Sequence, residues 1–301
     1  MQIAVIGAGY VGSRVLDSLG PHAAIACGRS LPVASRHSVR HLDLDREPLL
    51  LQRPMPARIL YTVPPSANSS DSPGDPRLTR FLGALDPPPE HIVYISTSGV
   101  YGDCGGELVD ESRHPAPRSP RALRRFAAER QLLNWCSKSG SACIILRVPG
   151  IYGPGRLGVK RIIAAGPLIL ESEANPGNRV HVDDLVAATI AALNRSIPQG
   201  IYNIGDGDFR STTWFAVTVA RLAGLAAPRS ISKAEALDTL SPARTSFLLE
   251  SRKLDTTRMR QVLGVQPRYA DAEDGIRASL RVDGLLRDPD IAGAGPAGRR
   301  A

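Results

Sequence analysis

Short apolar runs alternate with longer segments of helical periodicity along most of the chain. Strands that alternate with helices in this way predict a parallel sheet with helices on both of its faces. The expected fold class is therefore α/β with a doubly wound parallel sheet. The runs that predict its strands are residues 3–6, 23–27, 39–42, 58–63, 91–96, 142–148 and 200–204.

The pattern changes after the last predicted strand. Residues 212–222, 254–263 and 271–286 carry helical periodicity, and no strong strand pattern supports a second full sheet. We therefore expect a small, mostly helical C-terminal region. Residues 64–76 are rich in Pro, Ser, Asn and Gly and predict a surface loop. Residues 288–301 are mostly Gly, Ala, Pro and Arg and predict a disordered tail.

Composition restricts the class of protein. The chain has 301 residues, of which 43% are hydrophobic, enough for one large domain or two modest ones. No apolar run reaches the roughly 18 residues that a membrane-spanning helix needs, and no signal-peptide pattern precedes the first strand, so a cytoplasmic protein is expected. The four cysteines form no CxxC pair and the six histidines form no ligand cluster with them. We expect neither a disulfide framework nor a metal site.

The formal net charge of +8 would suit an acidic small ligand or a nucleic acid. Only four of the 37 basic residues are lysines, however, and alanine, glycine and proline are abundant. A GC-rich coding sequence would produce this bias by itself. Nucleic acid is therefore the least favoured of the partners that the charge suggests.

The segment IAVIGAGYVGSRVLDSL places Gly7, Gly9 and Gly12 in the spacing GxGxxG, after a predicted strand and at the start of a predicted helix. In that context the spacing indicates a dinucleotide site. Gly7 permits the tight turn, Gly9 lets a pyrophosphate approach the backbone, and Gly12 lets the helix pack on the strand. A glycine-rich turn without a ligand is the alternative interpretation.

The end of the second strand distinguishes NAD from NADP. An acidic residue there would bind the ribose 2′-hydroxyl of NAD, but the sequence reads Cys-Gly-Arg-Ser at 27–30. Arg29 and Ser30, which follow Gly28, would suit a 2′-phosphate, so NADP is favoured and NAD stays open. Asp43, at the end of the third strand, is expected to accept from the adenine amino group, although a turn-forming Asp is the simpler interpretation.

Four further segments carry a family resemblance. They are HIVYISTSGVYGD at 91–103, ILRVPGIYGPG at 145–155, RVHVDDLVAA at 179–188 and IYNIGDG at 201–207. Together with the glycine motif, and in this order, they resemble the extended short-chain dehydrogenase/reductase superfamily, of the NAD-dependent epimerase/dehydratase type. The resemblance covers about residues 2–286.

The resemblance implies a Rossmann domain and a smaller substrate domain. Residues 1–210 are then the NAD(P)-binding domain, with part of 149–178 on the substrate side, and residues 211–287 are the C-terminal substrate region. A small-molecule substrate is expected, and a homodimer is left open. Further cofactor contacts are expected, by position in the motifs, at Tyr10, Val11, Val63, Ser96 and Pro149.

The resemblance also implies hydride chemistry by a Ser or Thr, a Tyr and a Lys. The tyrosinate acts as general base or acid, the lysine lowers the tyrosine pKa and binds the nicotinamide ribose, and the hydroxyl residue polarises the substrate oxygen. The match to the VYG stretch places Thr97 in the hydroxyl position, with Ser98 as the second candidate. A role for both residues in capping the strand end is the structural alternative.

The tyrosine and the lysine of this family are missing. They lie four residues apart on the helix after this strand, often with a glutamate four residues later, which Glu129 fits. Arg125 then stands at the lysine position and Arg121 at the tyrosine position, and no tyrosine of the chain has a lysine four residues after it. Because arginine stays protonated, Arg121 cannot shuttle a proton, whereas Arg125 could still bind the ribose.

Arg121 and Arg125 belong to the arginine-rich stretch SPRALRRFAAE and share one face of a predicted helix. If that face meets the cleft, the pair is a clamp for a carboxylate or phosphate; if it meets water, the pair is a solvated stripe. The leading hypothesis is an NAD(P)-dependent oxidoreductase or epimerase with atypical proton-transfer groups. Its substrate is expected to be small and polar or anionic, with a sugar-nucleotide-like compound among the candidates. A non-catalytic NAD(P)-binding sensor or partner-binding protein is the alternative.

Overall fold

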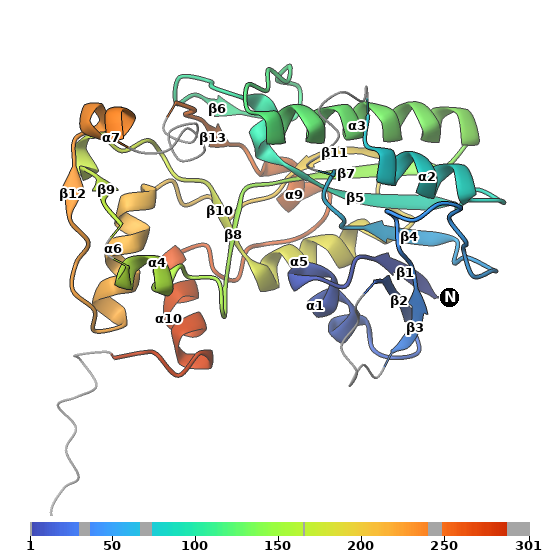
Figure 1. Ribbon diagram of the computed structural model, residues 1–301, viewed down its shortest axis with the longest axis horizontal. Coiled ribbons are helices and arrows are strands. Elements are labelled where there is room, and N and C mark those ends of the chain that lie inside the picture. The colour runs from blue at the N-terminus through green and yellow to red at the C-terminus, as the bar shows by residue number, and fades with distance from the viewer. Residues whose placement is uncertain (1, 30–36, 67–73, 165, 240–248, 288–301) are drawn as a thin grey trace, which may run out of the picture.

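The computed structural model describes residues 2–29, 37–66, 74–164, 166–239 and 249–287 (Figure 1). Within these residues, seven strands form one parallel sheet in the order β11-β7-β5-β4-β1-β2-β3. The order reverses between β1 and β4, as in a doubly wound sheet. The predicted α/β class is thus confirmed. Ser30 and the predicted tail lie outside the described residues.

Each predicted strand is present, with ends that shift by one or two residues. The strand expected at 58–63 ends at Tyr61. After it, the Thr62 backbone N–H still donates to the Ile6 carbonyl at 2.9 Å, and the Thr62 hydroxyl donates to the Gly7 carbonyl at 2.7 Å. The strands are β1 (Ile3–Ile6), β2 (Ala24–Gly28), β3 (Ser38–His41), β4 (Arg58–Tyr61), β5 (His91–Thr97), β7 (Ala142–Val148) and β11 (Gly200–Asn203).

Helices cover both faces of the sheet. α2 (Pro76–Ala84) and α3 (Pro120–Ser139) lie on one face, drawn above the sheet in Figure 1. α1 (Tyr10–Leu19) and α5 (Val182–Ala192) pack against each other on the opposite face. Each pair of helices packs on one face of the sheet and forms a hydrophobic core cluster with the strand side chains that point to that face.

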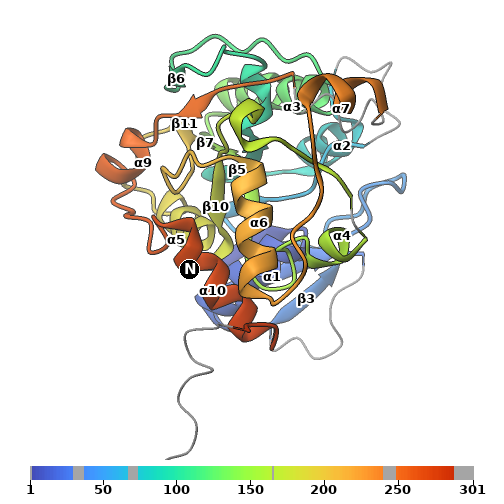
Figure 2. The same cartoon turned by 90° about the vertical axis from the view of Figure 1, so that its left-hand side faces the viewer.

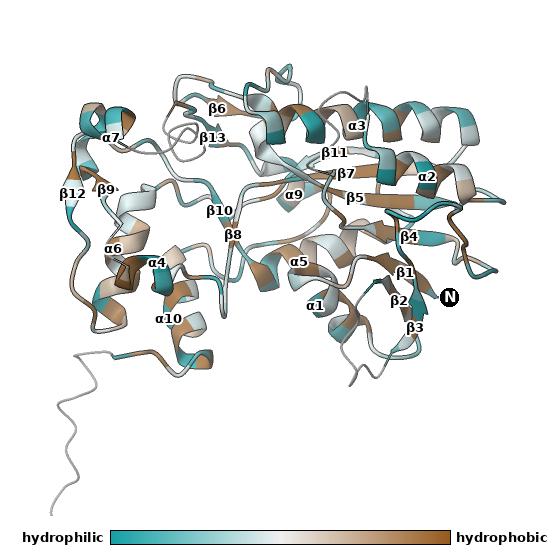
Figure 3. Cartoon of the chain, viewed as in Figure 1, coloured by the Kyte–Doolittle hydropathy of each residue, from teal (hydrophilic) through white to brown (hydrophobic). Residues whose placement is uncertain are grey.

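The alternation of side chains along β1 shows why both faces are apolar. Ile3 and Val5 pack in the cluster that contains α1 and α5, whereas Ala4 and Ile6 pack in the cluster that contains α2 and α3. Successive strand residues point to opposite faces, so a strand buried on both sides must be apolar throughout. Figure 3 shows this as continuous hydrophobic colouring along β5 and β7.

The C-terminal region forms a separate helical group beside the end of the sheet. α4 (Val159–Ile163), α6 (Thr212–Leu222) and α10 (Ala272–Val282) share a hydrophobic core, and Figure 2 shows α6 and α10 side by side. The expected helix at 254–263 is shorter, because residues 253–254 form a strand. The remaining elements are η1 (Ser98–Tyr101), β6 (Leu108–Val109), β8 (Gly150–Tyr152), β9 (Leu168–Ile169), η2 (Glu171–Glu173), β10 (Arg179–His181), β12 (Ser230–Ile231), α7 (Lys233–Thr239), β13 (Lys253–Leu254) and α9 (Thr257–Gln261).

The described part of the chain contains no helix long and apolar enough to cross a membrane. Over the same residues, no group of three or more His, Cys, Asp or Glu side chains could hold a metal ion. The cysteines are buried and unbonded to one another. A cytoplasmic location stays a prediction.

Candidate active site

The glycine loop between β1 and α1 has room for a ligand at one of its three glycines. Gly7 has φ +95°, and a Cβ there would lie 2.6 Å from the Thr62 hydroxyl oxygen. A Cβ on Gly12 would lie 2.1 Å from the Gly7 carbonyl oxygen, so this glycine packs the helix onto the loop. A Cβ on Gly9 would meet nothing within 4 Å. The loop therefore fits a pyrophosphate that approaches Gly9 at the N-terminus of α1.

A cavity of about 230 Å³ adjoins this loop. Gly28, Arg29 and Val63, three of the predicted cofactor contacts, line it. The Arg29 Nη1 atom lies 2.9 Å from Asp45 Oδ2, and the Arg77 Nε atom lies 2.6 Å from Asp45 Oδ1. The hydrogen bond from Arg77, with the charges of both arginines, lowers the pKa of Asp45 below its ordinary value.

The acidic residue that lines this cavity is Asp45 rather than the predicted Asp43. The Asp43 Oδ1 atom accepts the backbone N–H of Asp45 at 3.0 Å, as a turn-forming aspartate does. The segment HLDLD contains both carboxylates, so its sequence pattern does not distinguish Asp45 from Asp43. The contact of Asp45 with Arg77 could not be predicted from a local pattern, because Arg77 lies 32 residues further along the chain.

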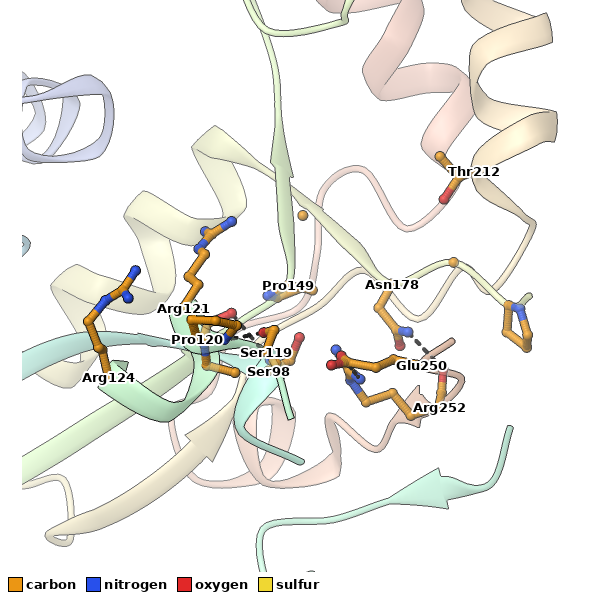
Figure 4. A pocket seen from close by; sticks show the side chains of 16 residues that line it. Ser98, Ser119, Pro120, Arg121, Arg124, Pro149, Asn178, Thr212, Glu250 and Arg252 are labelled. Carbon is orange, nitrogen blue, oxygen red and sulfur yellow. Dashed lines mark hydrogen bonds and ion pairs between the residues drawn. The ribbon is translucent and has the colours of Figure 1, made fainter. Parts of the chain in front are cut away.

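A larger cavity of about 620 Å³ lies at the ends of β5 and β7. Thr97, Ser98 and Pro149, all predicted, line it from the ends of these strands. In Figure 4, Arg121 and Arg124 lie on one side of it, and Asn178, Glu250 and Arg252 lie on the other. The full lining is Thr97, Ser98, Gly99, Ser119, Pro120, Arg121, Ala122, Arg124, Pro149, Gly150, Pro176, Gly177, Asn178, Thr212, Glu250 and Arg252.

Thr97 ends β5 with its side chain at the cavity. Its Oγ1 atom accepts the backbone N–H of Gly99 at 3.2 Å and so caps the short η1 helix. A hydroxyl that accepts one hydrogen bond still has its own proton to donate. Thr97 is therefore able to cap the strand end and to donate to a substrate oxygen at the same time.

The helix α3 begins as its sequence predicts. The Ser119 side chain accepts the backbone N–H of Ala122 at 3.4 Å, and Pro120 occupies the first turn. Arg121 lines the cavity, but Arg125 turns toward the sheet. The Nη1 atom of Arg125 donates to the Tyr94 hydroxyl and to the Ile95 carbonyl, both at 3.0 Å. The two arginines therefore have different surroundings despite their helical spacing.

A buried polar network holds the ends of β5, α3 and β7 together. The Ser96 hydroxyl donates to Glu129, and the Arg147 Nη2 atom lies 2.8 Å from Glu129 Oε2. The Arg147 guanidinium stacks over the Tyr101 ring, whose hydroxyl donates to Asn203 at 2.7 Å. Ser96, expected at the cofactor, thus donates its hydroxyl within this network, directly before Thr97.

Tyr10, the first residue of α1, links this helix to the loop after β8. Its hydroxyl donates to the Pro154 carbonyl at 3.0 Å, and the guanidiniums of Arg14 and Arg156 lie 3.9 and 4.6 Å from the centre of its ring. Burial raises the pKa of the Tyr10 hydroxyl. Val11, also expected at the cofactor, is buried in the core that α1 shares with α5.

A charged cluster supports the far wall of the larger cavity. The Arg179 Nη2 atom donates to the Ser211 carbonyl at 3.2 Å, beside the lining residue Thr212. The Arg179 Nη1 atom lies 3.4 Å from the Asp208 Oδ1 atom. Burial raises the pKa of the neighbouring Asp206 to about 8.

The comparison with protein families agrees with this geometry. Residues 77–205, which include β5, α3 and β7, match the NAD dependent epimerase/dehydratase family. Over these residues the chain is similar to that family. The match spans both Thr97 and Arg121. That Arg121 and Arg125 stand at the positions of the family's tyrosine and lysine stays a prediction.

Three curated relatives of the chain share about a quarter to a third of their aligned residues with it. The uncharacterized protein y4nG of Sinorhizobium fredii is 26% identical over 202 residues, 61% of this chain and 51% of that protein. Protein YeeZ of Escherichia coli K12 is 27% identical over 246 residues, 76% of this chain and 86% of that protein. The UDP-glucose 4-epimerase of Mycolicibacterium smegmatis is 30% identical over 194 residues, 60% of this chain and 59% of that protein. The chain thus spans only about half the length of y4nG.

Solved structures of this fold superpose on most of the chain. A conserved protein of unknown function from Silicibacter pomeroyi has a TM-score of 0.78 and 26% identity, over 93% of this chain and 98% of that one. MoeE5, solved in complex with UDP-glucose and NAD, has a TM-score of 0.73 and 23% identity, over 93% and 98% of the two chains. The latter likeness shows the shared fold.

Proposed function

We propose that the protein is an NAD(P)-dependent oxidoreductase or epimerase that acts on a small polar or anionic substrate. The observation that carries the proposal is the placement of two cavities at the carboxyl ends of the sheet strands. One adjoins the open glycine loop, and the other is lined by Thr97 and Ser98. This is where doubly wound sheets bind a dinucleotide and its reaction partner.

The residues of each cavity have distinct roles in this proposal. The loop at Gly7 and Gly9 and the N-terminus of α1 bind the pyrophosphate, and bound NAD or NADP would supply the hydride acceptor or donor. Thr97 and Ser98 hydrogen-bond the substrate oxygen and favour its negative form. Arg121 adds positive charge but moves no proton, because a guanidinium stays protonated. A sugar nucleotide belongs among the substrates to test, since one relative is a UDP-glucose 4-epimerase.

The cofactor half of the proposal predicts selective dinucleotide binding. We expect stripped protein to bind NADPH more tightly than NADH, and Arg29→Ala to reduce that preference by about tenfold, because a guanidinium pairs well with a 2′-phosphate. Calorimetric titration with the four nicotinamide dinucleotides measures this. Arg195→Ala, which removes an arginine from another exposed ion pair, should leave the preference unchanged. Binding of none of the four would overturn the proposal.

The catalytic half predicts a turnover that depends on the Thr97 hydroxyl. The panel of candidate substrates contains three classes of compound: hydroxy acids, phosphorylated alcohols and UDP-sugars. It also contains the oxo forms of the hydroxy acids and the phosphorylated alcohols. For the first two classes and their oxo forms, substrate-dependent change at the nicotinamide absorbance band is the measurement. Epimerisation regenerates the nicotinamide, so UDP-sugars are scored by chromatographic separation of the epimers.

We expect Thr97→Ala to lower kcat by about 100-fold, since a donor at the reacting oxygen typically contributes this much, and Thr97→Ser to restore most of it. Equal turnover by the alanine variant would remove Thr97 from the mechanism. Cofactor binding without turnover of any substrate would favour the non-catalytic alternative.

A further inference from the structure

Two arginines face the larger cavity without a carboxylate to neutralise them. Arg121 and Arg124 line it, and neither makes a hydrogen bond or an ion pair with any residue that the structure describes. Across the cavity, Arg252 lies 2.9 Å from Glu250, so that pair neutralises itself. The lining therefore carries excess positive charge, concentrated on the side of α3.

The position of these arginines on their helix adds to that charge. They lie within the first two turns of α3, a helix of 20 residues whose first turn contains no acidic residue. The N-terminus of a helix carries partial positive charge, which favours anions and disfavours arginine. Arg121 and Arg124 are therefore repelled by the partial positive charge at the start of α3. An anion bound in the cavity would be attracted by both arginines and by the helix N-terminus, and would offset this repulsion.

Other guanidiniums reinforce the positive field around Arg121. Partial burial, followed by the charges of Arg125 and Arg156, lowers the pKa of Arg121 from its ordinary value. Arg125 donates to Tyr94 and to the β5 backbone, and Arg156 lies over the Tyr10 ring. Both are held in place by these contacts. They add charge near Arg121, while the guanidinium of Arg121 keeps its donors for a ligand.

We propose that Arg121 and Arg124 form a binding site for an oxyanion group of the substrate, a phosphate or a carboxylate. The proposal rests on the proposed function only in taking this cavity as the substrate site. The same cavity contains Thr97 and Ser98, so the anionic group and the reacting oxygen belong to one small molecule. Arg121 then determines specificity at the position where the family has its proton-transferring tyrosine.

The test is a titration with small anions in the presence of saturating NADP⁺, so that the dinucleotide site is filled. Inorganic phosphate and malonate are the probes, one for each chemistry. We expect at least one of them to bind, and Arg121→Ala and Arg124→Ala each to weaken that binding by about tenfold, the effect of losing one charge-assisted contact. Arg130→Ala is the matched control, because Arg130 lies exposed on the same helix outside the cavity lining. The Arg130→Ala variant should bind the anion with the same affinity as the unchanged protein.

A melting curve supplies a second measurement that does not depend on the cofactor. Phosphate or malonate should raise the Tm of the unchanged protein and of Arg130→Ala, and raise that of Arg121→Ala less. Arg121→Lys, which keeps the charge and loses the planar fork, should bind with intermediate affinity. Binding of neither anion, or equal binding by Arg121→Ala, overturns the oxyanion site. Anion binding by a protein that binds no dinucleotide would overturn the proposed function and leave the oxyanion site standing.

Discussion

Replacing Gly9 with valine should weaken dinucleotide binding by about 100-fold and leave the fold intact. The backbone of Gly9 has φ −78° and ψ −158°, at the border of the extended region and outside the left-handed region that favours glycine. A Cβ at this position meets no protein atom within 4 Å, so the new side chain would occupy the space that the pyrophosphate needs. Calorimetric titration with NADPH and NADH measures the loss of affinity, and thermal melting checks the fold.

Gly83→Val is the matched control for this prediction. Gly83 is exposed on α2, and a Cβ there also meets nothing within 4 Å, but Gly83 lies outside the lining of both cavities. The control should bind the dinucleotide as the unchanged protein does. Equal affinity of Gly9→Val and Gly83→Val would show that the pyrophosphate does not approach the glycine loop.

Replacing Glu129 with leucine should lower the free energy of unfolding by about 3–5 kcal/mol, the usual result of leaving one member of a buried ion pair alone. Glu129 and Arg147 are 1% and 2% exposed, and Glu129 also accepts the Ser96 hydroxyl. The variant leaves a buried guanidinium without its carboxylate. Denaturant unfolding followed by circular dichroism measures the change.

Two variants make this result interpretable. Replacing Arg147 with methionine in the same chain should recover much of the loss, because an apolar pair avoids the uncompensated charge. Glu90→Ala removes a carboxylate from the exposed pair with Arg195 and should cost less than about 1 kcal/mol. A cost for Glu129→Leu as small as that of Glu90→Ala would contradict the burial of the pair between α3 and β7.

The candidate site was predictable where it follows a local pattern. Thr97 and Pro149 directly end strands that the apolar runs already mark, and both line the larger cavity. Arg121 was recognisable by its place in the helix after the strand. Asn178, Glu250 and Arg252 were not predicted, because they are ordinary polar residues and reach the cavity from 80 or more residues further along the chain than Thr97.

Tertiary contacts also separated residues that the sequence treats alike. Arg121 and Arg125 have the same type and share a helix face, yet one lines the cavity and the other binds Tyr94 and the β5 backbone. Asp43 and Asp45 alternate in one short segment, yet the cavity beside the glycine loop is lined by Asp45. Arg77, from the helix after β4, binds Asp45 there.

The sequence by itself determined the α/β class, the seven strands of the sheet and the glycine loop. Apolar periodicity reports burial locally, and a positive φ or a close approach at Gly7 and Gly12 requires glycine wherever the loop occurs. The packing of the elements decided which charged residues face the cavities and which are neutralised. The charge available to a ligand at Arg121 depends on which carboxylates lie within a few ångströms of it, and those distances exist only once the helices and strands have packed.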